Sequence, residues 1–193
     1  MKRLDVMVDL ETLGKDVDSP IIQIGALAFD IETGQTLKWM VEYPEVPKDA
    51  KVDGGTLRWW LDTDKELLTK TISKANTTEE RATLAFVDWI VKTATEYGLT
   101  SKDVYLWGNG ILFDNKIIQG KCERYGVPYP IQYQNDRDMR TIVDLYRTKD
   151  PQGYEAIKLS ASEGNTAHDA VDDCLTQMLI VSHAFKELTR KEE

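Results

Sequence analysis

The run LDVMVDLETLG, residues 4–14, constrains this chain more than any other stretch, because it reads as a buried strand that carries acids. Apolar side chains alternate with other residues along it, and this period of two predicts a β-strand over residues 4–10. Residues two apart on a strand point to the same face and lie about 6.6–7 Å apart. Asp9 and Glu11 are therefore neighbours on one face, close to the C-terminal end of the strand.

Two close carboxylates without a partner repel each other, and one of them takes up a proton. A divalent cation removes this repulsion, because carboxylate oxygens are preferred ligands of Mg²⁺ and Mn²⁺. The alternative is that the strand has ended and that both Asp9 and Glu11 are solvated. The motif D-x-E is short, and by itself it does not decide between a metal site and two solvated acids.

The rest of the chain predicts strands that first form a meander and then alternate with helices. Further strands are predicted at residues 21–29, 35–43 and 103–108, and helices at 56–63, 65–70, 114–125 and 167–190. A short strand or turn followed by a helix is predicted at 136–147, and loops at 44–55 and 148–166, the second of them mobile. This order predicts an α/β fold, a mixed sheet covered by helices, in a single domain of residues 1–193.

One more helix is predicted in the middle of the chain. Thr77 and Glu80 have the spacing of a capping box, so a helix is expected to open there and to end near Gly98. The residues expected to share one face of this helix are Leu84, Val87, Asp88, Val91 and Ala94.

Composition limits the class of protein. The formal net charge of −9 argues against strong non-specific binding of polyanions, so a nucleic-acid substrate would need a small basic patch or a bound metal. Cys122 and Cys174 lie far apart and outside any CxxC pair, which is typical of free thiols in a cytoplasmic protein. The first residues do not read as a signal peptide, and no apolar run is long enough to cross a membrane.

The stretch WGNGILFDNK, residues 107–116, is the second candidate for chemistry. A strand ends there, a Gly-Asn-Gly turn follows, and Asp114 lies at or near the start of a helix. Asp is among the best N-cap residues, so Asp114 is either a cap or a ligand. Gly108 and Gly110 allow the backbone to approach a nucleotide, and a tight turn would need them too.

The third candidate is GNTAHDAVDDC, residues 164–174, just before or inside the first turn of the last helix. His168 is either a general base or a surface residue, and the acids around it also suit a helix N-terminus. His183 lies among ordinary helix residues. On a regular helix His168 and Asp172 share a face, whereas Asp173 lies about 140° away from His168.

Together and in this order, Asp9-x-Glu11, Asp114 and His168-x4-Asp173 resemble the DEDD exonuclease superfamily in its histidine variant. The stretches TLRWWL, WGNGILFDN and NDRDMRTIVDL resemble, within it, the ribonuclease-AS-like 3′–5′ exoribonucleases, which are found also in phages and prophages. The resemblance covers nearly the whole chain. It implies a ribonuclease H-like fold, with a five-stranded mixed sheet flanked by helices.

The resemblance also implies two divalent metal ions, Mg²⁺ or Mn²⁺, near the C-terminal end of the first strand. Asp9 would bridge both ions, Glu11 and Asp173 would complete the site of the ion that binds the attacking water, and Asp114 would serve the second ion. His168 would take the proton from that water. The resemblance favours Asp173 over Asp172, which requires His168 to lie on a loop before the helix.

Substrate contacts are expected from a further set of residues on the same resemblance. They are Thr12, Trp59, Trp60, Asn109, Gly110, Phe113, Asn115 and Arg140. Trp59 and Trp60 point about 100° apart on a helix, so one of them is expected to stack on a base, with core packing as the alternative for either. Phe113 either wedges between bases or fills the core. Arg140 either meets a phosphate or pairs with Asp136, Asp138 or Asp144.

The function expected on this resemblance is 3′–5′ exonuclease activity on single-stranded nucleic acid, RNA before DNA, with release of nucleoside 5′-monophosphates. A ribonuclease H-fold endonuclease and a non-catalytic nucleic-acid-binding module are the alternatives, and five intact site residues speak against the second of these. Members of the family are often dimers, so a homodimer is expected as well. No membrane partner is expected.

Overall fold

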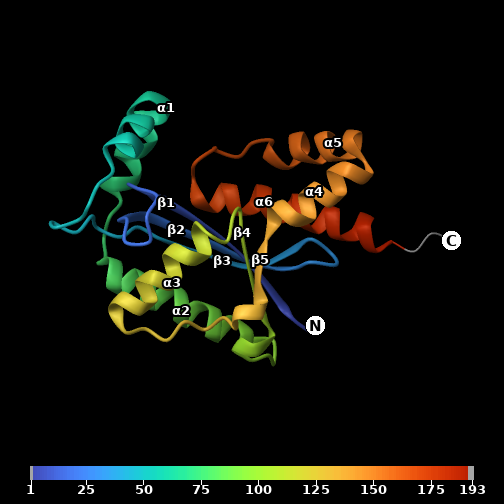
Figure 1. The fold of residues 1–193 in the computed structure, drawn as a ribbon. Helices are drawn as coiled ribbons and strands as arrows, with labels where there is room; N and C mark the ends of the chain where they lie inside the picture. The colour runs from blue at the N-terminus through green and yellow to red at the C-terminus, as the bar shows by residue number, and fades with distance from the viewer. Residues whose placement is uncertain (1, 191–193) are drawn as a thin grey trace.

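Strand β1 (Leu4–Thr12) is the middle strand of a five-stranded mixed sheet with the order β3-β2-β1-β4-β5 (Figure 1). The computed structural model describes residues 2–190. The other strands are β2 (Ile21–Asp30), β3 (Gln35–Glu42), β4 (Val104–Gly108) and β5 (Asp136–Asp138). β1, β2 and β3 form an antiparallel meander, and β4 and β5 run parallel to β1. The predicted α/β fold with five mixed strands is confirmed.

Helices cover both faces of this sheet (Figure 1). They are α1 (Gly54–Ser73), α2 (Glu79–Glu96), α3 (Asp114–Tyr125), α4 (Met139–Lys149), α5 (Pro151–Ser162) and α6 (Ala170–Thr189), with short 3-10 segments η1 (Ser101–Asp103) and η2 (Tyr133–Asn135). α2 and α3 pack on one face, and α6 and α4 pack on the other, where α5 lies against both. Within residues 2–190, no helix combines the length and apolar composition that a membrane span needs.

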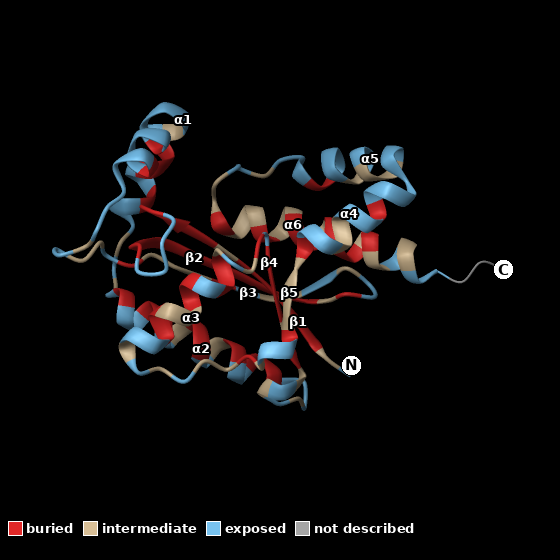
Figure 2. Ribbon diagram, viewed as in Figure 1, coloured by how far each residue is buried: buried red, intermediate tan, exposed pale blue. Residues whose placement is uncertain are grey.

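Strand β1 is buried along almost its whole length (Figure 2), and the alternation of its side chains divides the core between the two faces. Val6 and Val8 are fully buried in the cluster that α2 and α3 complete, whereas Met7 is fully buried in the cluster under α6 and α4. Because side chains alternate on a strand, Asp9 and Glu11 follow Met7 onto the face of α6. A smaller cluster around Trp60 fixes α1 near the end of β1.

Gly25 on β2 brings the start of α6 close to the sheet. It is the register partner of Asp9, and a Cβ atom built on it would lie 2.5 Å from the backbone carbonyl of Ala170, the first residue of α6. The thiol of Cys174, one turn further along α6, donates to the Gly25 carbonyl at 3.4 Å. A glycine is therefore required at this position, because any side chain would push α6 away from Asp9.

Several local predictions were wrong. Residues 151–162, expected to lie in a mobile loop, form α5: Asp150 caps this helix by accepting from the backbone N–H of Gly153, and a proline occupies the first turn. The cap of α2 is Thr78 rather than Thr77. The two short helices predicted at 56–63 and 65–70 are joined in α1 across a kink at Asp64.

The face predicted for α2 was wrong in part. Val87 and Ala94 are buried as predicted, but the buried side is centred on Ala82, Phe86 and Ile90, and Leu84 and Val91 are exposed. The prediction placed the apolar Leu84 and Val91 on the buried face, and this shifted the predicted face by part of a turn.

Substitution of Gly25 tests the contact between the sheet and α6. We expect Gly25→Ala to lower the free energy of unfolding by about 1–3 kcal/mol or more, because the clashing atoms belong to a backbone that moves little. Urea unfolding followed by circular dichroism measures the change. Gly54→Ala is the matched control, since nothing lies within 4 Å of a Cβ atom there. Equal unfolding midpoints for both variants would show that α6 does not depend on this approach.

Candidate active site

The end of β1 supplies two acids to the face that α6 covers. Glu11 is 7% exposed, and Asp9 is partly buried beside it. The side-chain amide of Gln177, on α6, donates to Asp9 Oδ1 at 2.8 Å. The strand therefore holds both carboxylates at the junction between the sheet and the last helix.

Asp114 reaches the same place from α3. It is the first residue of that helix, 3% exposed, and its Oδ1 accepts from the backbone N–H of Leu10 at 3.2 Å. Phe113 occupies the cap position and makes no capping hydrogen bond through its side chain. Asp114 is therefore not the helix cap, and the bond to Leu10 fixes its carboxylate beside those of Asp9 and Glu11.

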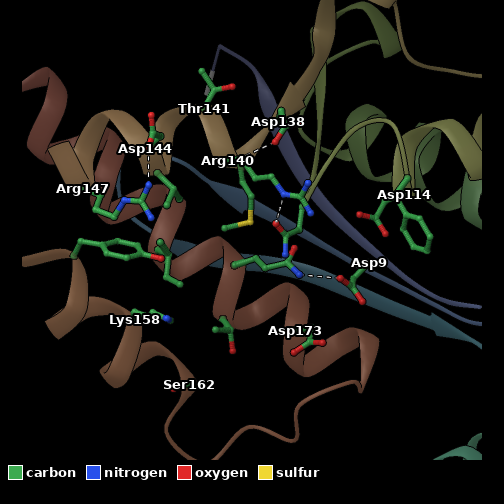
Figure 3. A pocket seen from close by; sticks show the side chains of 18 of the residues that line it. Asp9, Asp114, Asp138, Arg140, Thr141, Asp144, Arg147, Lys158, Ser162 and Asp173 are labelled. Carbon is green, nitrogen blue, oxygen red and sulfur yellow. Dashed lines mark hydrogen bonds and ion pairs between the residues drawn. The ribbon is translucent and has the colours of Figure 1, made fainter. Parts of the chain in front are cut away.

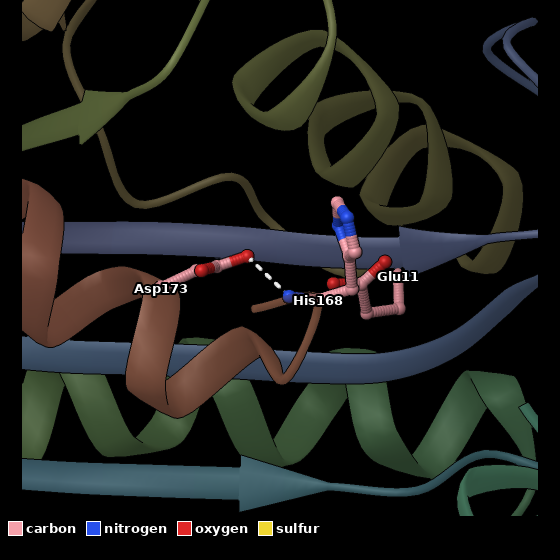
Figure 4. A group of neighbouring side chains, drawn as sticks. All are labelled: Glu11, His168 and Asp173. Carbon is pink, nitrogen blue, oxygen red and sulfur yellow. Dashed lines mark hydrogen bonds between the residues drawn. The ribbon is translucent and has the colours of Figure 1, made fainter. Parts of the chain in front are cut away.

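His168 lies on the loop before α6, with the positive φ of 65°. Its backbone N–H donates to Asp173 Oδ2 at 3.0 Å, so the loop and the first turn of the helix are joined at this point. The ligand atoms of Glu11, His168 and Asp173 all lie within 4.8 Å of one another (Figure 4). The carboxylate of Asp172 instead accepts from the backbone N–H of Thr166, at 2.9 Å.

This geometry answers the question of register between Asp172 and Asp173. The helical-wheel argument needs His168 inside the helix, and Asp169 is the N-cap residue that follows it. The structure thus brings Asp173, and not Asp172, beside Glu11 and His168. The role of Asp173 as a metal ligand stays a prediction.

Burial raises the pKa of each acid at the site, and the charges of neighbouring site acids add to this for Asp9 and Glu11. Burial, followed by the charges of Asp9 and Asp173, raises the pKa of Glu11 to about 10. Burial and the charge of Asp114 raise the pKa of Asp9 well above its usual range. Burial raises the pKa of Asp114 to about 7, although the hydrogen bond from the Leu10 N–H acts in the opposite direction. Burial also raises the pKa of Asp173. Without a cation, the folded chain therefore favours the protonated forms of these acids.

The donor set fits divalent metal ions. Hard cations such as Mg²⁺ and Mn²⁺ prefer carboxylate oxygens, and a cation stabilises the ionised form of each acid that burial disfavours. The close approach of Glu11, His168 and Asp173 gives one such group of ligand atoms. Asp9 and Asp114 lie next to it and enlarge the set.

The acids line one end of a cleft of about 1080 Å³ (Figure 3). Phe113 and Asn109 line it from the loop after β4, and Arg140 lines it from α4. The cleft continues past the acids between α4, α5 and α6. A ligand much larger than a metal ion can therefore reach the carboxylates.

Comparison with known families identifies this arrangement. A family model described as the 3′–5′ exoribonuclease Rv2179c-like domain matches residues 4–185. The chain belongs to this family. The resemblance inferred from Asp9, Glu11, Asp114, His168 and Asp173 is thereby confirmed at the level of the family, a group of 3′–5′ exonucleases.

Relatives outside the family model are more distant. The exodeoxyribonuclease of Enterobacteria phage T4 is 21% identical over 209 residues, covering 94% of this chain and 89% of the phage protein. Among solved structures, E. coli exonuclease I bound to single-stranded DNA has a TM-score of 0.67 at 18% identity, over 98% of this chain and 41% of that one. The nuclease domain of 3′hExo bound to rAMP, a DEDDh family member, has a TM-score of 0.62 at 12% identity, over 96% and 93%. These likenesses show the ribonuclease H-like fold, and the chain spans less than half the length of exonuclease I.

The two adjacent tryptophans in this exonuclease-family chain have different environments. Trp60 is 1% exposed and donates from Nε1 to the Thr12 carbonyl at 3.0 Å, so it packs in the core and is not a substrate contact in this structure. Trp59 is 44% exposed, and its ring meets the His168 ring edge-on, with centroids 5.0 Å apart. Trp59 is therefore the one of the pair that a base can reach.

Asn115 and Thr12 also have structural partners. The Asn115 side chain is 3% exposed and donates to the Leu106 carbonyl and to Asp136, so its amide is bound within the fold, and the expected contact with a nucleotide stays a prediction. The Thr12 hydroxyl donates to the Gly14 carbonyl at 2.6 Å and is buried. Neither residue lines the cleft.

The other predicted contacts surround the cleft. Asn109 is exposed and accepts from Arg140 Nε at 3.3 Å. Gly110, with φ of 112°, leaves room for the Arg140 guanidinium, which a Cβ atom there would meet at 3.1 Å. Within residues 2–190, no carboxylate lies in ion-pair distance of that guanidinium: Asp138 accepts from the backbone N–H groups of Arg140 and Ile111, and Asp144 pairs with Arg147. Arg140 is thus available to an anionic ligand.

Gln177 was missed in the sequence. It lies four residues after Asp173, one turn along the same face of α6, and its buried Oε1 has no hydrogen-bond partner among the described residues. The only sequence signal was this spacing from an expected ligand. By donating to Asp9, it positions the carboxylate that the family resemblance gives the central role.

Separate substitution of Asp172 and Asp173 tests which of the two acids belongs to the site. Asp173→Asn should lower activity by more than the roughly 10–100-fold that loss of an outer partner costs at a metal site. Asp172→Asn should keep most of the activity, because its side chain can still accept from Thr166. Steady-state rates and Mn²⁺ titration by calorimetry measure both. A crippled Asp172→Asn beside a mild Asp173→Asn would reverse the assignment.

The repulsion among the acids predicts a pH dependence of stability. Since the pKa of Glu11 rises from 4.5 to about 10 on folding, the metal-free folded state binds more protons than the unfolded state in that window. In EDTA, the contribution of Glu11 to the free energy of unfolding is therefore most favourable at low pH and is lost as pH rises toward about 10. Asp9→Asn removes one charge, so we expect it to raise the free energy of unfolding at alkaline pH by about 1 kcal/mol or more. Urea unfolding measures this change. Parallel pH profiles for wild type and variant would contradict the repulsion.

Proposed function

We propose that this chain removes nucleoside 5′-monophosphates one at a time from the 3′ end of single-stranded nucleic acid, RNA in preference to DNA. One observation carries the proposal: four carboxylates and a histidine from three separate segments meet at one end of a cleft, in a member of a 3′–5′ exoribonuclease family. The preference for RNA follows the family description. The distant phage relative acts on DNA by its name, so both substrates belong in the test.

Asp9, Glu11, Asp114 and Asp173 would hold two divalent ions, Mg²⁺ or Mn²⁺. Bound metal of this kind supplies two things to phosphodiester hydrolysis, a lowered pKa for the attacking water and neutralisation of the charge on phosphate oxygens. The residues of the chain set where this happens. Gln177 and the Leu10 N–H hold Asp9 and Asp114 in place through hydrogen bonds at 2.8 and 3.2 Å.

His168 would accept the proton of the attacking water. Its ring is partly exposed, lies against Trp59, and is held near Glu11 and Asp173 by the loop conformation. A positioned general base contributes roughly 10²–10⁴ in rate. The bond from the His168 backbone N–H to Asp173 couples the position of the base to that of an acid in the metal set.

The terminal nucleotide would be held from both sides of the acids. Trp59 offers an exposed ring to a base, and Phe113 reaches the cleft from the loop before α3. Base–aromatic stacking is worth roughly 1–3 kcal/mol per base and tolerates any sequence. Asn109 and Arg140 would meet the sugar or phosphate.

Two further expectations belong to the proposal. The chain is expected to act as a homodimer, as family members often do. It is also expected to be cytoplasmic, and the buried, unpaired thiols of Cys122 and Cys174 agree with a reducing compartment.

The direction of cleavage can be read from matched substrates. A 5′-labelled single strand with Mn²⁺ should shorten as a ladder from its 3′ end, and a 3′-phosphate should slow the reaction, because the site would bind a free terminus. RNA and DNA of the same sequence give the preference, and EDTA should abolish both reactions. Internal fragments from a closed circle would instead identify an endonuclease.

A further inference from the structure

The cleft is larger than one nucleotide and its metal ions need. Its volume of about 1080 Å³ is at the upper end of the range for small-molecule sites. The acids occupy one end, and the remainder runs between α4, α5 and α6 (Figure 3). Apart from Arg140 at its near end, this remainder, the groove, has no role in the removal of the terminal nucleotide described above.

Residues at helical spacing line the groove on two helices. On α4 they include Arg140 and Arg147, seven residues apart. On α5 they are Tyr154, Lys158 and Ser162, four residues apart. Residues three, four or seven apart share a face of a helix, so each helix presents one continuous stripe to the groove. The lining is thus a property of whole helix faces.

The stripes run from a near end beside the acids to a far end. Arg140 bonds to Asn109 beside the acids, and Arg147 follows about 10 Å further along the helix axis. At the far end the Arg147 guanidinium lies 6.0 Å from the centre of the Tyr154 ring. With roughly one phosphate per 3.4 Å of stacked strand, this length corresponds to about three nucleotides.

Positive charge lines this groove in a chain whose net charge is −9. Among the described residues, Arg147 pairs only with Asp144, at 2.7 Å, and both side chains are more than half exposed. Such a pair is weak, so a phosphate can take the guanidinium. Lys158 is exposed, and within residues 2–190 no carboxylate lies in ion-pair distance of its amine. Cations beside an aromatic ring are the elements with which proteins bind single strands.

We propose that the groove holds the single strand upstream of the nucleotide that is removed, with Arg147 and Lys158 on its phosphates and Tyr154 against a base. The inference rests on the proposed function, because the groove is continuous with the site of cleavage. Asp144 also lines the groove, but it is paired with Arg147. A nucleic acid fits better than a peptide, since three cations and one aromatic ring line the groove. The enzyme then gains affinity with each nucleotide until the groove is filled.

The test compares a long substrate with a short one. We compare kcat/KM for a 5′-labelled strand of about ten nucleotides with kcat/KM for a dinucleotide. The double variant Arg147→Ala/Lys158→Ala should lower the ratio of the first value to the second by roughly tenfold. The affinity for the strand should also depend less on salt. The slope of log affinity against log salt concentration should become smaller in magnitude by about 1.4, because two phosphate contacts are lost. Tyr154→Leu should act in the same direction on the ratio.

Arg81→Ala/Lys92→Ala is the matched control, since it removes the same charge from exposed positions on α2, across the sheet from the groove. The proposal is overturned if the groove variant and this control give the same ratio and salt slope. Hydrolysis of the dinucleotide by the wild-type chain reports separately on the proposed function. If neither substrate is cleaved, fluorescence anisotropy of the labelled strand decides whether the groove variant binds more weakly than the control.

Discussion

Mutual repulsion among partly buried carboxylates is the constraint on which the rest of this structure depends. The carboxylates of Asp9, Glu11, Asp114 and Asp173 come from β1, α3 and α6. Burial raises the pKa of all four, and the charges of neighbouring site acids raise those of Asp9 and Glu11 further. A fold that needed only stability would keep such groups apart or exposed. Their convergence is explained when cations are part of the working molecule, and the hydrogen bonds from Gln177 and Leu10 then serve to hold the ligands before the cations bind.

That convergence requires α6 to start close to the sheet. Gly25 and the first residue of α6 make backbone contact that no side chain would allow, and the Cys174 thiol donates to the strand one turn later. Just before this contact, the chain enters the helix through His168, which has a positive φ. The same turn lifts His168 out of the helical register, so that Asp173 rather than Asp172 faces the acids.

The sequence predicted what local patterns encode. The meander, β4, and the helix that starts at Asp114 and stops at Gly126 follow from alternation, turns and a glycine in the left-handed conformation. It could not separate Trp60 from Trp59, because burial depends on where α1 lies against Thr12. Asn115 read as a substrate contact because its neighbour is an acid of the site, yet its amide serves Leu106 and Asp136 on distant segments. α5 was missed for a related reason: only Ala161 on it is buried, and the helix packs on α4 and α6 rather than on the sheet.

The missed helix changes how the cleft works. α5 runs back toward the acids, so its last turn, at Ser162, lies at the near end of the groove and its first turn, at Tyr154, lies beside Arg147 at the far end. The seven residues between α5 and α6 include His168. One continuous segment therefore carries part of the groove, the proposed base and an acid of the proposed metal set. This arrangement would strengthen the binding of a polyanion to an acidic chain. The proposed metal ions offset the charge of the strand only close to the acids, and the groove cations would meet the phosphates beyond that distance.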